Sequence, residues 1–235
     1  MDAIIPAAGL ASRMRGMPKF LLPADVNYKT LLETHIEQLS EICKNIYIAT
    51  RPDLIPLIES LNFKFKNIKV IGLESKSMSE TVLKTIEYSE SDSFILVMPD
   101  TYFYGDQPYG YLDSNPEICD LACWKIRDKQ RGKLGEVSFD NKMNLIKIVD
   151  KQPENGFEYA WGALTFSRKL LKYIEVEDPH IGYAVKNALA SKEKVTVKTL
   201  KGSYYDCGTP EEYLELFSKI VTGGKNEFSN NRSFL

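Results

Sequence analysis

Histidine is scarce in this chain, and the cysteines are few and widely spaced. Only two histidines, His35 and His180, occur among 235 residues, so a histidine-rich metal site is impossible and a Ser-His-Asp hydrolase is disfavoured. The four cysteines lack the paired Cys-x-x-Cys spacing of a zinc site. We expect His35 to lie on a helix surface. For His180 we favour the start of a helix over the alternative, a substrate contact.

Long apolar runs and a strong charge excess are also missing. No apolar stretch approaches the length of a membrane span, and the N-terminus lacks a signal-peptide pattern. The net charge is −2, from 30 basic and 32 acidic residues, which gives no general attraction to nucleic acid or to an anionic membrane. We therefore expect a cytoplasmic protein with no nucleic-acid or membrane partner. The sequence leaves open whether it forms a homo-oligomer.

The first half of the chain alternates short apolar runs with amphipathic segments. Strands are predicted at residues 2–6, 46–50, 68–72 and 94–98, and helices at 30–43, 53–61 and 77–88, two of which begin with capping boxes at Thr30 and Ser77. This alternation is typical of an α/β fold with a doubly wound, Rossmann-like, mostly parallel sheet. In such sheets ligands bind beyond the carboxyl ends of the strands.

The pattern changes after Asp120, where strands follow one another with few helices between them. Strands are predicted at 121–126, 136–139, 145–149, 159–166, 195–200 and 203–205, and helices at 168–174, 181–191 and from a third capping box at Thr209 to about 221. We expect one domain over 1–221. Its first half spans 1–115, its second half, which carries the mixed strands, spans 116–221, and a flexible tail spans 222–235.

A loop of small residues follows the first predicted strand. Small side chains let backbone N–H groups approach an anion closely, and the loop comprises Ala7, Ala8, Gly9, Leu10, Ala11 and Ser12. Arg13 can hold a phosphate with its planar fork, and Lys19 adds a point charge. The loop matches neither the Gly-Lys-Ser/Thr phosphate loop nor the Gly-x-Gly-x-x-Gly dinucleotide pattern. The small-residue loop with its two basic side chains therefore predicts a binding site for a nucleoside triphosphate.

The whole opening resembles the signature of the sugar-phosphate nucleotidylyltransferases. The matching residues are Gly9, Ser12, Arg13, Met14, Pro18 and Lys19, whereas Ala11 stands where that family usually has glycine. The resemblance implies that Arg13 stabilises the leaving pyrophosphate and that Lys19 bridges the phosphates. Both are candidate catalytic residues. The resemblance also implies that residues 1–221 form one nucleotidyltransferase domain, with a nucleotide-binding half at 1–115 and an acceptor-binding half at 116–221.

Two aspartates each follow a predicted strand and could hold a cation. Mg²⁺ is usually bound through one or two carboxylates together with substrate phosphates. Val97-Met98-Pro99-Asp100 resembles the family strand that ends in the first metal ligand, and Asp206 lies in a segment, residues 205–213, that resembles the family's Trp-x-Asp-x-Gly-Thr-Pro-Glu box. The resemblance implies that Asp100 and Asp206 are the two metal ligands and that Mg²⁺ is the cofactor.

Further matches concern the acceptor. Asp150-Lys151-Gln152-Pro153 resembles the family's Glu-Lys-Pro element, which implies that Lys151 places the acceptor phosphate. Aspartate for glutamate and the extra Gln152 leave the identity of the acceptor open. Trp161-Gly162 resembles a turn that contacts the sugar, and Glu158 and Gly135 are further candidates for the acceptor pocket.

Ser79 and Glu80 are expected to contact the nucleotide, because residues 77–81 occupy the place where relatives read the base and ribose. The opening residues are most like uridylyltransferases and the serine-rich turn is closer to some cytidylyltransferases, so a pyrimidine is favoured. The expected reaction joins an NTP and a sugar-1-phosphate into an NDP-sugar and pyrophosphate. Two alternatives stay open: CTP-dependent transfer to phosphocholine or another non-sugar phosphomonoester or phosphonate, and a non-catalytic nucleotide-binding regulatory paralogue. An aromatic cage from Trp124, Trp161, Tyr102 and Tyr104 would favour phosphocholine.

Overall fold

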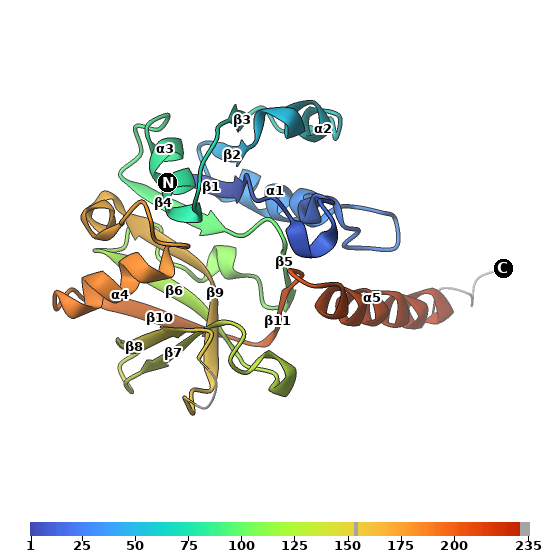
Figure 1. Ribbon diagram of the computed structural model, residues 1–235. Helices are drawn as coiled ribbons and strands as arrows, with labels where there is room; N and C mark the ends of the chain where they lie inside the picture. Colours follow the sequence, from blue (N-terminus) through green and yellow to red (C-terminus); the bar gives the residue numbers. More distant parts are fainter. Residues whose placement is uncertain (153–154, 231–235) are drawn as a thin grey trace.

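The computed structural model describes residues 1–152 and 155–230, including their side chains except those of Arg13 and of residues 223–230. In the N-terminal half, strands and helices alternate as the sequence predicts (Figure 1). The elements are β1 (Asp2–Ala7), α1 (Leu31–Ile42), β2 (Ile46–Thr50), α2 (Ile55–Glu59), β3 (Ile68–Gly72), α3 (Met78–Ile86) and β4 (Ser93–Val97). β1 pairs in parallel with β2 and β4, and β2 pairs in parallel with β3.

The second half extends the same sheet with mostly antiparallel strands. β9 (Tyr159–Ser167) lies antiparallel between β4 and β6 (Cys119–Lys125), and β10 (Val195–Leu200) pairs in parallel with β6. The hairpin of β7 (Gly135–Phe139) and β8 (Leu145–Asp150) attaches to β9, and α4 (Gly182–Ala190) packs on β8. The predicted α/β fold with a mostly parallel sheet and an added mixed-strand half is confirmed.

A separate pair of strands, β5 (Thr101–Gly105) and β11 (Gly202–Asp206), crosses between the two halves. β5 lies in a stretch where no strand was expected from the sequence. α5 (Pro210–Asn230) follows β11 and projects from the body of the molecule in Figure 1. This helix continues past its expected end at about Val221. The division into halves and the flexible tail at 222–235 stay predictions.

The central strands β1, β2 and β4 are buried on both faces, which accounts for their continuous apolar sequences. In β1, Ala3, Ile5 and Ala7 pack in the cluster that contains α1 and α2, whereas Ile4 packs in the cluster that contains α3 and α4. Side chains alternate between the faces of a strand, so a strand covered on both sides needs no polar positions.

His35 corrects one expectation, because it is buried and not on a helix surface. Its Nε2 lies 2.9 Å from the Thr101 carbonyl oxygen, and its Nδ1 lies near the Tyr109 hydroxyl. A carbonyl oxygen only accepts, so Nε2 carries the proton and Nδ1 accepts from Tyr109. Burial lowers the pKa of His35 to about 4, and the neutral ring ties α1 to the start of β5.

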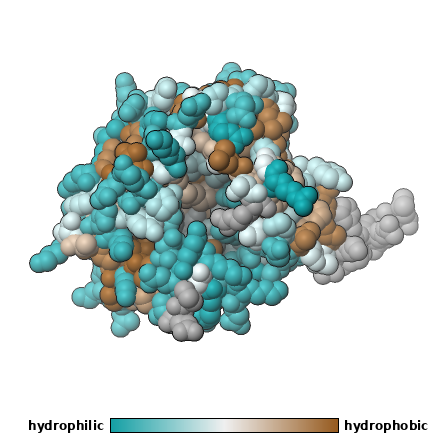
Figure 2. Space-filling model, viewed as in Figure 1, coloured by the Kyte–Doolittle hydropathy of each residue, from teal (hydrophilic) through white to brown (hydrophobic). Residues whose placement is uncertain are grey.

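None of the described helices is long and apolar enough to cross a membrane. The face drawn in Figure 2 is mostly hydrophilic, with separated apolar patches and a hollow near its centre.

Candidate functional site

The loop after β1 forms one wall of a cavity of about 760 Å³, here called the loop cavity. Pro6 is followed in the wall by the expected residues Ala7, Ala8, Gly9, Leu10 and Ala11. The opposite wall comes from the turn before α3 and its first residues, at Ser75, Lys76, Ser77, Met78 and Thr81. The volume of the loop cavity falls within the range of roughly 300–1,000 Å³ that is usual for small-molecule sites.

Ala11 has a left-handed backbone, with φ 49° and ψ 36°. Its carbonyl accepts hydrogen bonds from the N–H groups of Met14 and Gly16, which closes the loop into a tight turn. A left-handed conformation suits glycine and is unfavourable for alanine, so the alanine at this position carries strain. The predicted catalytic side chain of Arg13, the second residue after Ala11, lies outside the described part of the structure.

Lys19 stands at the junction of the loop cavity with a second, deeper cavity, here called the inner cavity. Its Nζ lies 3.0 Å from Oδ2 of Asp100, and both side chains are largely buried. Lys19, Asp100, Met78 and Met98 line both cavities, so these residues form the boundary between them. Any two molecules that occupy the two cavities therefore meet at the lysine and the carboxylate.

Asp206 lines the inner cavity, and the pairing of β5 with β11 brings it beside Asp100. In that register Asp206 faces Thr101, and the N–H of Cys207 donates to the carbonyl oxygen of Asp100 at 2.8 Å. Burial, followed by the neighbouring charge of Asp100, raises the pKa of Asp206 from 3.8 to about 6, although Lys19 opposes the shift. A pair of adjacent carboxylates with one raised pKa is an arrangement that a cation would stabilise.

The set of available donors fits a hard cation that shares its ligands with a substrate. Among the described residues, no group of three or more His, Cys, Asp or Glu could hold a metal by itself. Asp100 and Asp206 offer carboxylate oxygens only, which suits Mg²⁺ completed by phosphate oxygens and water. The Gly208 N–H donates to Oδ1 of Asp206 at 3.0 Å, and this contact fixes the carboxylate.

The inner cavity gathers most of the predicted acceptor residues. Lys151, Gly135, Trp161 and Gly162 all line it, together with the boundary residues. Gly135 packs so closely on Trp161 that an added Cβ would lie 2.2 Å from the indole Nε1. Trp161 is nearly buried, and its Nε1 has no hydrogen-bond partner among the described residues. The indole N–H is therefore a buried donor covered by the Gly135 backbone, and it is the ring of Trp161 that contributes to the cavity wall.

Four of the predicted site residues do not line either cavity. Ser79, the second residue of α3, is completely buried, because its side chain faces the core. Glu80 turns back along its own helix to the Lys76 N–H and to Lys84. Ser12 and Glu158 are exposed and lie off both cavities, and the carbonyl oxygen of Glu158 accepts a hydrogen bond from the Ile126 N–H.

Sequence reasoning missed several residues of the inner cavity. Lys133 and Tyr204 line it, although neither belongs to a motif that the sequence made visible. His180, which the sequence offered as a helix start or a substrate contact, precedes α4 and also lines the inner cavity. Its Nδ1 accepts from the Gly182 N–H, and its Nε2 contacts Oδ1 of Asp150 at 3.1 Å.

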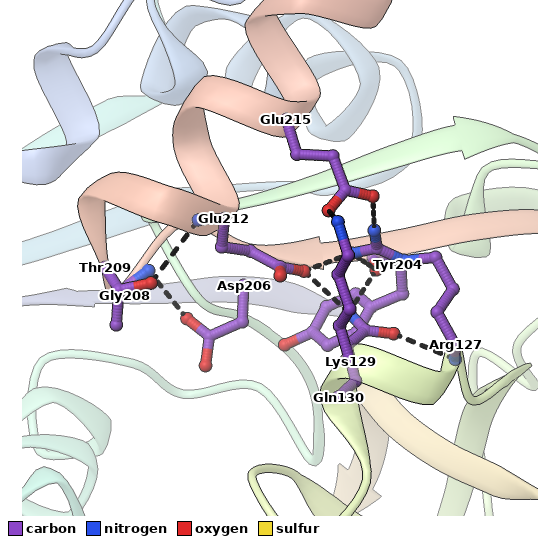
Figure 3. Close-up of polar contacts among 9 residues, drawn as sticks. All are labelled: Arg127, Lys129, Gln130, Tyr204, Asp206, Gly208, Thr209, Glu212 and Glu215. Atoms are coloured by element: carbon purple, nitrogen blue, oxygen red, sulfur yellow. Dashed lines mark hydrogen bonds and ion pairs between the residues drawn. The ribbon is translucent and has the colours of Figure 1, made fainter.

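A charged network at the start of α5 supports this side of the site (Figure 3). Arg127 pairs with Glu212 and Glu215, and its guanidinium lies 4.0 Å above the centre of the Tyr205 ring. Glu212 was expected to close a capping box with Thr209. Its N–H does reach Thr209 Oγ1, at 3.4 Å, but its carboxylate binds Arg127 and Gln130 instead.

Comparison with known proteins identifies the family. Residues 3–187 match the model of the MobA-like NTP transferase domain, and the chain therefore belongs to this family. A putative mannose-1-phosphate guanyltransferase of Sulfolobus acidocaldarius is 29% identical over 94% of this chain. The chain spans 64% of the length of that relative. The resemblance to the sugar-phosphate nucleotidylyltransferases is thereby confirmed.

Solved structures show the same fold at low sequence identity. A putative glucose-1-phosphate thymidylyltransferase from Bacillus anthracis superposes with a TM-score of 0.77 at 18% identity, covering 94% of this chain and 95% of that one. The inositol-1-phosphate CTP transferase from T. maritima gives 0.76 at 19% identity, covering 94% and 96%. These similarities concern the fold alone.

Proposed function

We propose that this MobA-like NTP transferase moves a nucleoside monophosphate from an NTP to a sugar-1-phosphate, which yields an NDP-sugar and pyrophosphate. The observation that carries the proposal is that Lys19 and Asp100 line both cavities, with Asp206 beside them on the wall of the inner cavity. The NTP occupies the loop cavity and the acceptor occupies the inner cavity. The α-phosphate then lies at the boundary, where the acceptor phosphate can approach it.

The reaction requires positioning and charge neutralisation more than proton transfer. An oxygen of the acceptor phosphate attacks the α-phosphorus in line, a new P–O bond forms, and the bond to the β-phosphate breaks to release pyrophosphate. The attacking oxygen is already anionic, so no general base is needed. Catalysis therefore depends on groups that hold two anions close together.

Each predicted catalytic residue has a place in this scheme. The backbone N–H groups of the loop bind the triphosphate, Lys19 bridges its phosphates, and Lys151 places the acceptor phosphate. Arg13 stabilises the leaving pyrophosphate, a role that rests on the sequence resemblance. Asp100 and Asp206 hold Mg²⁺, which, when bound, neutralises phosphate charge and makes the α-phosphorus easier to attack.

The predicted preference for a pyrimidine base is kept as a proposal, although the curated relative carries the name of a guanyltransferase. The wall that would meet the base contains Lys76, Ser77 and Thr81, whose polar groups can read the edge of a base. A test of all four NTPs decides the point.

The phosphocholine alternative receives little support from the inner cavity. Only Trp161 of the four candidate cage residues lines this cavity. Trp124 is buried in a stack with Phe103 and Tyr204, and two lysines stand where a quaternary ammonium would need aromatic rings or carboxylates. The regulatory-paralogue alternative predicts NTP binding without product.

The decisive assay is pyrophosphate release with Mg²⁺, using each NTP against a panel of sugar-1-phosphates, inositol-1-phosphate and phosphocholine. We expect release to require one NTP and one acceptor together, and to fall by at least about a thousandfold in Asp100→Asn with Asp206→Asn. Glu87→Gln, at an exposed residue of the α3 end, is the matched control. Near-normal turnover of the double variant would refute the proposal, and tight NTP binding without release would favour the regulatory paralogue.

A further inference from the structure

The hairpin of β7 and β8 brings a second lysine to the acceptor side of the inner cavity. Lys133 and Lys151 flank the hairpin at its open end, where Gly135 pairs with Asp150, and both line the cavity. Neither ammonium has a carboxylate at salt-bridge distance within the described residues, whereas Lys19 is paired with Asp100. Two such lysines beside one cavity form a site for an anion.

The backbone N–H group of each lysine is hydrogen-bonded to a neighbouring carbonyl oxygen. The Lys151 N–H donates to the Leu134 carbonyl at 3.0 Å, and the Lys133 N–H donates to the Gln130 carbonyl at 3.0 Å. Lys151 itself adopts a left-handed backbone, with φ 48°. Such conformations persist where the surrounding structure imposes them, and they concentrate at ligand sites.

The turn that carries Lys133 is also fixed to the metal-binding strand. Gln130 is almost completely buried, and its Nε2 donates to the Tyr204 carbonyl at 2.8 Å and to Glu212 at 2.7 Å (Figure 3). Tyr204 lies in β11, two residues before Asp206. Arg127, at the start of the same turn, pairs with the glutamates of α5. These contacts set the position of Lys133 relative to Asp206.

Charge balance gives this lysine a role. The acceptor phosphate is close to doubly negative and must approach an NTP that is itself anionic, past the carboxylates of Asp100 and Asp206. Mg²⁺ and Lys19 serve the triphosphate, so a single Lys151 would leave the acceptor phosphate with one unbalanced charge. A second ammonium in the same cavity removes that imbalance.

We infer that Lys133 binds the acceptor phosphate together with Lys151, and that the turn from Arg127 to Lys133 is the support that aims it. This inference rests on the proposed function and adds a residue to the acceptor site. It applies to any phosphomonoester acceptor, because the phosphate is the part that the two lysines recognise.

The test compares Lys133→Ala, Lys151→Ala and the double variant with Lys142→Ala, an exposed lysine at the other end of the same hairpin. We expect each single variant at the site to raise the acceptor KM at least about tenfold, the size of one lost charge-assisted hydrogen bond, while the NTP KM changes less than about twofold. Lys133→Arg keeps the charge and is expected to recover most of the acceptor affinity. Lys142→Ala is expected to match the unaltered protein.

Binding to the full chain gives a second readout that needs no turnover. Calorimetry with glucose 1-phosphate, mannose 1-phosphate and inorganic phosphate as probes should show weaker binding in Lys133→Ala than in Lys142→Ala. An acceptor KM and phosphate-probe affinity unchanged in Lys133→Ala would overturn the inference while leaving the proposed function intact. Failure of every probe to bind the unaltered protein would also overturn it. Loss of pyrophosphate release in Asp100→Asn with Asp206→Asn reports on the proposed function separately.

Discussion

Replacement of Asp206 by asparagine should make the protein more stable while it abolishes transfer. Burial and the neighbouring charge of Asp100 raise the pKa of Asp206 from 3.8 to about 6, so the ionised carboxylate costs folding free energy at neutral pH. A shift of about two units corresponds to roughly 3 kcal/mol. Asp206 is half-buried, and solvent screening reduces this electrostatic cost. We therefore expect Asp206→Asn to raise the free energy of unfolding by about 1–3 kcal/mol. The amide oxygen can still accept from the Gly208 N–H.

The pH dependence makes this prediction specific. The folded-state pKa lies above the unfolded value, so the cost is fully present above about pH 6 and disappears as the pH falls below 3.8. Thermal unfolding with EDTA should therefore show Asp206→Asn melting roughly 2–10 °C higher at pH 8, and no such advantage near pH 4. Glu87→Gln serves as the surface control. Equal or lower stability of the variant at pH 8, or a difference that does not vary with pH, would refute the reasoning.

Three further substitutions test the local geometry, each by urea unfolding. Ala11→Gly should stabilise the protein by about 1 kcal/mol, because φ is 49° at this position, and a loss of stability would contradict the assigned strain. Gly202→Ala should lower the free energy of unfolding by more than about 2 kcal/mol, since the added Cβ would lie 1.9 Å from the backbone carbonyl oxygen of Tyr104. Its control, Gly110→Ala, adds a Cβ into open space and should be nearly neutral. Arg127→Ala should cost about 3 kcal/mol, because Glu212 loses its cation and Glu215 keeps only the exposed Lys129 at 3.5 Å, and a cost below about 1 kcal/mol would show that the network is weak.

Local sequence signals located most of the secondary structure. The strand at 46–50 and the capping box of Thr30 and Glu33 occur as predicted, because apolar runs and capping side chains act over a few neighbouring residues. The box expected at Thr209 is only half formed. The carboxylate of Glu212 pairs with Arg127, which is distant in the sequence, and does not turn back to the Thr209 backbone. A pattern of neighbouring residues gives no sign of such a long-range partner.

Two further misses have the same origin. His35 occupies a helical position that the pattern cannot distinguish from a surface site, and only its contacts with Thr101 and Tyr109 make it a core residue. β5 was missed because its existence depends on pairing with β11 and not on its own periodicity. Ser79 and Glu80 were assigned to the nucleotide, although one turns into the core and the other along its helix.

The sequence by itself determined the α/β class, the loop after β1, and the candidate residues Lys19, Asp100, Lys151 and Asp206, because each lies in a motif of neighbouring residues. Only the tertiary structure decided which of these meet. The pairing of β5 with β11 brings Asp206 to Asp100, and the β7–β8 hairpin adds Lys133 to the cavity that contains Lys151. Such contacts join residues distant in the chain, and they stabilise the protein only after folding has brought these residues together.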